Sequence, residues 1–368
     1  MEKFCVFCGE APQEKNKEHV LPAWLIEMTG DPGHEAHFGI DFTKEPLKAR
    51  KFAFDSLVFP ACTTCNTRFA ELEGRVKPIF ELLLSYKPLS SDQLILLLDW
   101  LDKVRVGLWL GYLYLDKNWM GIEPNFHIQS RIGQLDRMVS ILRVENAGVG
   151  LTFAGPHFKS YQLSPTCFGL GVNGLWLVNA SGVGLCSQRL GFPYLEPLRF
   201  NEAHLLEASP HTGSERIMNP VERIATLPRT VSLYQPVFRA FRERENSEKY
   251  LGGDWIKQRT ADAANGYGKL FVQKSDSVQI YPDNASTDWA PAELWNKKEV
   301  SYRLGEHIFD RIRRNYENSI GLAPTQDERR HLRREGVMAR MLDLAMLSNA
   351  SEVEGNKKSP KRRARRRR

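Results

Sequence analysis

The sequence lacks an uninterrupted apolar run long enough to cross a membrane. Its most apolar stretch, residues 94–115, is interrupted by two Asp, one Lys and one Arg, and charges at mid-span are costly in a bilayer. We therefore expect this stretch to be a buried helix and expect no membrane contact. No apolar signal segment follows Met1, so we expect the protein to be cytoplasmic.

Cysteine is scarce, with 6 residues in a chain of 368, which argues against a disulfide framework and favours a reducing compartment. Four of these residues form two Cys-x-x-Cys pairs, Cys5/Cys8 and Cys62/Cys65. Each pair fixes two thiolates on one turn, and two pairs supply the four ligands of a tetrahedral zinc ion. The two other cysteines stand alone in apolar runs and are predicted to be buried core thiols.

A dinucleotide-binding motif and an internal repeat are also missing. Gly-x-Gly occurs at residues 148–150 and 169–171, but no Gly-x-Gly-x-x-Gly opens a helix there. Asn173-Gly174 lies between two apolar runs and predicts a hairpin of an antiparallel sheet. Residues 92–115, with a capping-box signature at Ser90, and residues 130–142 are predicted to be helices. These patterns predict an α+β fold.

Charge is unevenly distributed along the chain. Residues 357–368 carry nine Lys and Arg and no acid, whereas the net charge of the chain is +7, so the rest is about neutral. We expect this tail to be disordered and to bind a phosphate backbone in a salt-dependent way. A solubility tail and a nuclear-localisation signal are the alternatives. A helix is predicted over residues 327–347, and its arginines form either a solvated face or a second contact with the DNA backbone.

The most informative stretch is the first 80 residues. Glu18-His19 lies between the two cysteine pairs, at the end of a strand predicted over residues 16–20, and Asn66 directly follows the second pair. Phosphodiester hydrolysis needs a base for the attacking water and a divalent cation. A neutral imidazole suits the first role, and the oxygens of Glu18 and Asn66 suit a magnesium-like ion. If the zinc site draws residue 66 back to the strand, all three residues converge.

The pattern Cys5-x-x-Cys8, Glu18-His19-x-x-Pro22 and Cys62-x-x-Cys65-Asn66 resembles the HNH endonuclease family. The resemblance covers about residues 1–80 and implies a ββα-metal nuclease fold with an appended four-cysteine zinc site. It implies that His19 is the general base and that Glu18 and Asn66 bind a catalytic Mg²⁺ or Mn²⁺. Glu18 stands where Asp is more usual in the family, which lengthens the ligand arm but keeps the carboxylate.

The middle residue of the family motif is missing. The family often has Asn about five residues before the second cysteine pair, where this chain has Leu57. Asp55 or Ser56 could take over the role of orienting the imidazole, and the choice between them stays open. His34 and His37 lie in an insertion, residues 34–51, that we expect to be irregular; they either approach the site or lie on the surface.

Together these features predict three parts: a zinc-bound nuclease domain over residues 1–86, a domain of helices and antiparallel sheet over residues 87–350, and a disordered basic tail over residues 351–368. We expect a metal-dependent endonuclease acting on DNA, with RNA as a further possible substrate. The second domain would select the substrate or regulate activity. The alternative is a non-catalytic zinc module in a DNA-binding or regulatory protein. The oligomeric state is not readable from the sequence.

Overall fold

The computed structural model describes most of the chain and shows a mixed α+β fold. The described residues are 3–14, 16–30, 35–41, 48–53, 57–115, 121–144, 148–156, 158–195, 199–200, 206–207, 210–218, 230–274, 277–282, 307–313, 326–327, 330–331, 333–334, 336–341 and 343. The basic tail, His34, Asp55 and Ser56 lie outside this part, so the predictions made for them stay predictions.

The N-terminal part contains two short antiparallel strands followed by a long helix. Strand β1 (Asn16–His19) pairs with β4 (Val58–Ala61), and α2 (Thr63–Leu84) starts two residues after β4. A short helix, α1 (Ala23–Met28), follows β1, and Pro22 is its N-cap residue. The fixed φ of proline suits this entry to a helix.

The insertion between β1 and β4 contains regular structure. Strands β2 (Glu35–Asp41) and β3 (Lys48–Ala53) pair as an antiparallel hairpin, so the expectation of an irregular segment was wrong. Residues 52–60 are rich in Phe, Leu and Val and predict a single strand; the structure has the end of β3 and the separate strand β4 there. The charge-rich sequence of this insertion carries no clear strand pattern, and the pairing of the two strands shows only in the structure.

Helix α2 is longer and less interrupted than the sequence suggests. The sequence predicts a helix that starts near Asn66, a favoured N-cap residue, and breaks at Gly74. The helix instead begins at Thr63, with Cys62 as the N-cap, and continues through Gly74 and Pro78. Proline in a helix interior costs about 3 kcal/mol. The apolar side chains around Pro78 are buried, and this burial offsets the cost; they are Val76, Ile79, Phe80 and Leu83.

Helix α3 (Ser91–Leu115) is a long buried helix, as predicted. Its capping box is present: Gln93 N–H donates to Ser90 Oγ at 3.2 Å and Ser90 N–H donates to Gln93 Oε1 at 2.9 Å. Side chains on all sides of the helix are buried, including Asp102, Lys103 and Arg105. Such a helix must be surrounded by other elements, and each buried charge requires a partner.

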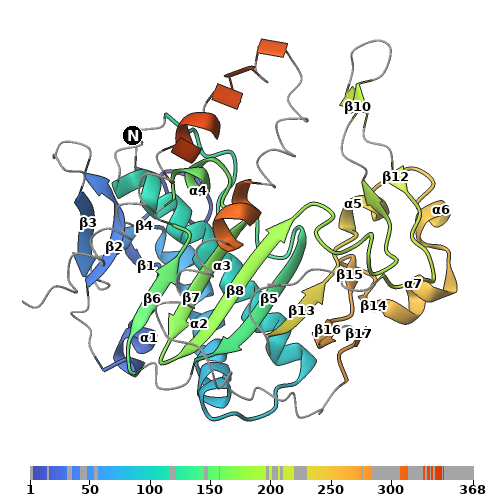
Figure 1. Ribbon diagram of the computed structural model, residues 1–368, viewed down its shortest axis with the longest axis horizontal. Coiled ribbons are helices and arrows are strands. Elements are labelled where there is room, and N and C mark those ends of the chain that lie inside the picture. Colours follow the sequence, from blue (N-terminus) through green and yellow to red (C-terminus); the bar gives the residue numbers. More distant parts are fainter. Residues whose placement is uncertain are drawn as a thin grey trace, which may run out of the picture.

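A seven-stranded antiparallel sheet covers α3, in the order β17-β16-β13-β5-β8-β7-β6 (Figure 1). Its strands are β5 (Asp136–Arg143), β6 (Leu151–Ala154), β7 (Cys167–Val172), β8 (Leu175–Gly182), β13 (Val231–Gln235), β16 (Phe271–Lys274) and β17 (Ser277–Ile280). The predicted hairpin joins β7 to β8, and Asn173 and Gly174 both have positive φ, 49° and 83°. This conformation belongs to the tight two-residue turn that Asn-Gly favours.

The helix predicted over residues 130–142 was wrong, because most of this segment is β5, the middle strand of the sheet. Every residue of β5 is buried. A strand covered on both faces has no alternation of apolar and polar residues, so its sequence pattern does not separate it from a buried helix.

The other labelled elements are short. They are α4 (Lys159–Leu163), β9 (Tyr194–Leu195), β10 (Arg199–Phe200), β11 (Leu206–Glu207), β12 (Pro210–His211), α5 (Arg239–Arg242), α6 (Glu248–Leu251), α7 (Asp254–Arg259), β14 (Thr260–Asp262) and β15 (Tyr267–Gly268). Residues 307–313 are also helical.

One hydrophobic core joins the N-terminal part to the rest of the chain. The cluster of buried apolar residues extends from Cys5 to Ile312. Backbone hydrogen bonds also cross the expected boundary at residue 86: Ile128 N–H donates to Val6 O at 3.1 Å, and Gln129 N–H donates to Phe7 O at 2.9 Å. The division into residues 1–86 and 87–350 stays a prediction, but the two parts share their interior.

Candidate metal centre and catalytic residues

The four cysteines of the two Cys-x-x-Cys pairs meet in one cluster. Their Sγ atoms all lie within 4.8 Å of one another. Cys5 and Cys8 lie on a turn closed by Gly9 N–H donating to Cys5 O at 2.9 Å, and Gly9 has a φ of 87°, which glycine adopts without strain. Cys62 and Cys65 lie at the start of α2. The predicted convergence of the four thiols is confirmed.

The chemistry of this cluster fits a zinc ion. Two backbone N–H groups point at its sulfurs: Cys62 N–H donates to Cys5 Sγ at 3.2 Å and Gln13 N–H donates to Cys62 Sγ at 3.4 Å. Burial, together with the neighbouring Cys5 and Cys8, raises the pKa of Cys65 to about 12. Four thiolates at this separation therefore need a cation, and zinc is the ion that four cysteines favour.

Within the described ranges, this cluster is the one set of three or more His, Cys, Asp or Glu side chains close enough to share an ion. The two remaining cysteines, Cys167 and Cys186, are buried and free, as expected of core thiols. Burial raises the pKa of Cys167 to about 12, so this thiol is unreactive.

The structure separates the side chains of Glu18 and His19. Glu18 lies opposite Phe59 in the strand pair and is only 4% exposed, whereas His19 lies opposite Val58 and is exposed. Successive residues of a strand point to opposite faces. His19 is therefore reachable from solvent at the end of β1, and Glu18 points into the protein.

Asn66 lies beside β1. Its Nδ2 donates to the backbone oxygen of Lys17 at 3.3 Å, across 49 positions of sequence. The second cysteine pair begins α2, and the first turn of this helix places Asn66 against the strand. Asn66 is not the helix N-cap, because Cys62 occupies that position.

Glu18 is held by two residues that sequence reasoning did not select. Lys103 Nζ of α3 lies 2.5 Å from Glu18 Oε1 and 2.5 Å from Glu73 Oε1 of α2. The Lys103 and Glu73 side chains are 1% and 17% exposed. Burial lowers the pKa of Lys103, but the two carboxylates outweigh it and raise the pKa overall. Burial raises the pKa of Glu18, and Lys103 opposes that rise.

Of the other histidines considered, His37 is placed only through its backbone, in β2 opposite Lys51 of β3. His34, Asp55 and Ser56 lie outside the described residues. The residue that would orient the imidazole of His19 thus stays open.

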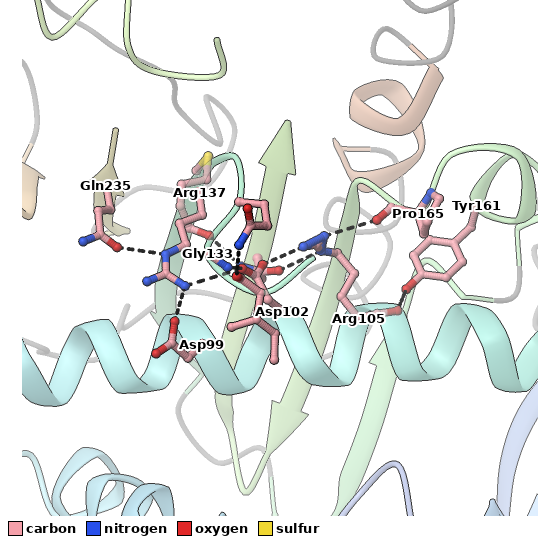
Figure 2. Close-up of polar contacts among 12 residues, drawn as sticks. Asp99, Asp102, Arg105, Gly133, Arg137, Tyr161, Pro165 and Gln235 are labelled. Carbon is pink, nitrogen blue, oxygen red and sulfur yellow. Dashed lines mark hydrogen bonds and ion pairs between the residues drawn. The ribbon is translucent and has the colours of Figure 1, made fainter. Parts of the chain in front are cut away.

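A second buried charge network fixes α3 to the sheet (Figure 2). Arg137 of β5 donates to Asp99 Oδ1 at 2.5 Å and, through Nε, to Gln235 Oε1 at 2.8 Å. Arg105 donates to Asp102 Oδ1 at 2.6 Å and to Asn179 Oδ1 at 3.1 Å. These buried charges are paired with one another, so the network orients the helix on the strands.

No protein-family model, no curated protein and no solved structure matches the chain. Among the described helices, none combines the length and the apolar character needed to cross a membrane.

Proposed function

We propose that the protein is a metal-dependent endonuclease that hydrolyses phosphodiester bonds in DNA. The observation that supports this proposal best is the contact between Asn66 Nδ2 and Lys17 O, which lies next to the strand end carrying His19. The exposed His19 ends β1, and Asn66 and the second cysteine pair lie at the start of α2, which follows β4, the partner strand of β1. This arrangement is compatible with the HNH resemblance, and it leaves the histidine accessible to a large substrate.

In this proposal His19 is the general base. A neutral imidazole accepts the proton of the attacking water at near-neutral pH, and an exposed position lets it reach a phosphate on a duplex. By the HNH resemblance, the side-chain oxygen of Asn66 and the carboxylate of Glu18 would hold Mg²⁺ or Mn²⁺, because such ions prefer oxygen ligands. Asn66 lies beside β1, whereas the carboxylate of Glu18 is buried and paired with Lys103. When bound, the ion stabilises the charge that develops on the phosphoryl group.

The basic tail, residues 357–368, would add affinity for the phosphate backbone that does not depend on base sequence. The large sheet domain would select the substrate or regulate cleavage. The rival function is a zinc module that binds nucleic acid without cutting it, since four-cysteine sites are also common in recognition modules.

The proposal is tested by incubating supercoiled plasmid with the full chain and Mg²⁺, Mn²⁺ or no divalent ion. We expect metal-dependent nicking by the wild type and a loss of at least 100-fold in rate for His19→Ala, because general-base catalysis contributes about 10²–10⁴-fold. His19 is exposed, so the variant should keep its melting temperature within about 1 °C, as expected of surface changes of about 0.5 kcal/mol or less. His331→Ala, which removes an exposed histidine far along the chain, is the matched control.

Equal cleavage by His19→Ala and the wild type would remove His19 from the reaction. A wild type that binds DNA or RNA but cuts neither with any of these metals would favour the non-catalytic rival.

A further inference from the structure

A cavity of about 280 Å³ lies between α2, α3 and the turn that precedes β5. None of the described residues that line it belongs to the cysteine cluster or to the candidate catalytic set. Ligand pockets in proteins usually measure about 300–1,000 Å³, so this cavity suits one small ligand or one unit of a longer chain. Three elements contribute its lining, namely Arg68, Phe69 and Leu72 of α2, Asp99 of α3, and Gln129, Ile132 and Gln134 of the turn.

One side of the cavity is apolar and is held in place by the core. The ring of Phe69 stacks on that of Phe7, with 4.2 Å between their centroids. Leu72 and Ile132 are partly buried and pack against the same core. Because these side chains are supported from behind, the apolar wall is present before any ligand arrives, and it suits a flat apolar group.

The polar side chains of the cavity include both an acid and a base. Asp99 is paired with Arg137, yet its side chain stays 28% exposed, so the carboxylate can accept a hydrogen bond from a ligand. Arg68 is exposed and lies over the Phe69 ring, 5.9 Å from its centroid. In the described part of the chain, Arg68 and Asp99 line the same cavity without pairing with each other.

A nucleotide matches this combination. Its phosphate is an anion for Arg68, and its base has apolar faces for the wall formed by α2 and the turn. The edge of a base carries amino groups that donate to carboxylates, and the amide of a glutamine pairs with such an edge. Asp99 and Gln129 supply these two kinds of group.

The position of the cavity favours a nucleotide within a strand. Phe69 follows Asn66 by three residues on α2, and positions three apart lie on the same side of a helix. The cavity therefore begins about one helical turn, about 5 Å, from Asn66. A strand bound at Asn66 would bring a neighbouring nucleotide to the cavity.

We propose that this cavity binds the base of an unpaired nucleotide of the substrate strand, next to the position of cleavage, and that Arg68 contacts the phosphate of that nucleotide. In a duplex the nucleotide must first leave the stack, as it does in enzymes that extrude a base. This inference rests on the proposed function, because it takes the strand to pass Asn66. It names the substrate class as nucleic acid with an unpaired nucleotide beside the cut.

The test measures binding rather than cleavage, with the full zinc-loaded chain and no added divalent ion. Fluorescence anisotropy compares a labelled DNA duplex that has one bulged nucleotide with the same duplex in which the bulged position is abasic. The bulge fixes which nucleotide is unpaired, and a salt concentration of about 0.2 M weakens contacts of the basic tail. We expect the wild type to bind the bulged duplex about 5- to 100-fold more tightly, as for the contribution of one stacked base.

Two variants at exposed positions locate the effect. Gln129→Ala should lower this preference at least about threefold, because it removes a partner of the base edge. Arg68→Gln should weaken binding of both duplexes equally and reduce the salt slope by about 1, because it removes a phosphate contact. Gln188→Ala and Arg216→Gln, the same changes at exposed positions outside the cavity, should match the wild type.

Equal binding of the two duplexes by the wild type would overturn the inference, and so would a Gln129→Ala variant that keeps the full preference. Deoxynucleoside monophosphates are tested as competitors. If they bind while the duplexes are not distinguished, the cavity takes free nucleotides and the assignment to the strand is wrong. If the wild type prefers the bulged duplex but cuts no nucleic acid with any metal, the nuclease proposal fails and the binding site stands. If it cuts without this preference, only the inference fails.

Discussion

At the scale of single residues, Asp343 shows how one buried side chain attaches a distant segment. Its carboxylate accepts the N–H groups of Lys159 at 2.5 Å and Ser160 at 3.0 Å, at the start of α4. The side chain is fully buried. Burial raises the pKa of Asp343 to about 6, although both backbone hydrogen bonds and the nearby Lys159 lower it. The C-terminal segment is thus attached to the body by a carboxyl group whose ionisation costs free energy.

This raised pKa predicts a dependence of stability on pH. The folded protein binds the Asp343 proton more tightly than the unfolded chain, whose Asp pKa is about 3.9. The Asp343 contribution therefore favours the folded state at low pH and is lost as the pH rises from about 4 to 6, by up to about 3 kcal/mol. Urea unfolding between pH 4 and pH 7 should show this loss in the wild type and a smaller loss in Asp343→Asn.

The control for this experiment is Asp254→Asn, a change at an exposed carboxylate of α7. It should reproduce the pH profile of the wild type. Parallel profiles for the wild type and Asp343→Asn would contradict the raised pKa of Asp343.

At the scale of helices and strands, an element was predicted correctly from the sequence when the contacts that stabilise it are local. The start of α3 and the hairpin between β7 and β8 were predicted correctly, because a capping box and an Asn-Gly turn act within four residues. Strand β5 and the continuity of α2 through Pro78 were not, because burial against other elements outweighs the local pattern.

The same distinction applies to the candidate site. The spacing of Cys5, Cys8, Cys62 and Cys65 predicted their cluster, because a Cys-x-x-Cys pair places two thiols on one turn in the geometry of metal ligands. Lys103 and Glu73 were missed. A lysine inside an apolar helix signalled a buried charge with a partner, but many acids compete for that role. Only the packing of α2 and β1 against α3 selects Glu73 and Glu18.

The packing of α3 predicts opposite effects for two glycine substitutions. A Cβ at Gly111 of α3 would overlap the buried ring of Phe59, whereas a Cβ at Gly74 of α2 would meet nothing within 4 Å. Alanine favours a helix over glycine by about 1 kcal/mol, and overpacking costs about 1–3 kcal/mol. We expect Gly74→Ala to stabilise the protein by up to about 1 kcal/mol and Gly111→Ala to destabilise it by up to about 2 kcal/mol, the overpacking cost less the helix-propensity gain.

Chemical denaturation of both variants, with equal m-values, measures these differences. A stabilising Gly111→Ala would show that Phe59 moves aside without cost and that α3 and β4 are not tightly packed.

At the scale of the whole molecule, the cysteine cluster should support more than its own segment. Structural zinc contributes about 10 kcal/mol or more of folding free energy in zinc-finger peptides, and here the cluster adjoins the continuous core. We expect Cys62→Ser to lose bound zinc and to lower the temperature of the main thermal transition by at least about 10 °C, corresponding to several kcal/mol at this chain length.

Zinc content by mass spectrometry and circular dichroism melting test this expectation. Cys167→Ala changes a buried thiol outside the cluster and should keep one zinc ion per chain. A Cys62→Ser variant that keeps its zinc, or that melts as the wild type does, would contradict a structural four-cysteine site.

The hydrogen bonds from Ile128 and Gln129 to Val6 and Phe7 have a consequence for how this protein can change over evolution. The apolar side of the N-terminal part is covered by α3, where Val20 lies against Gly107. We therefore expect sequence changes on one side of this contact to constrain those that the other side can accept.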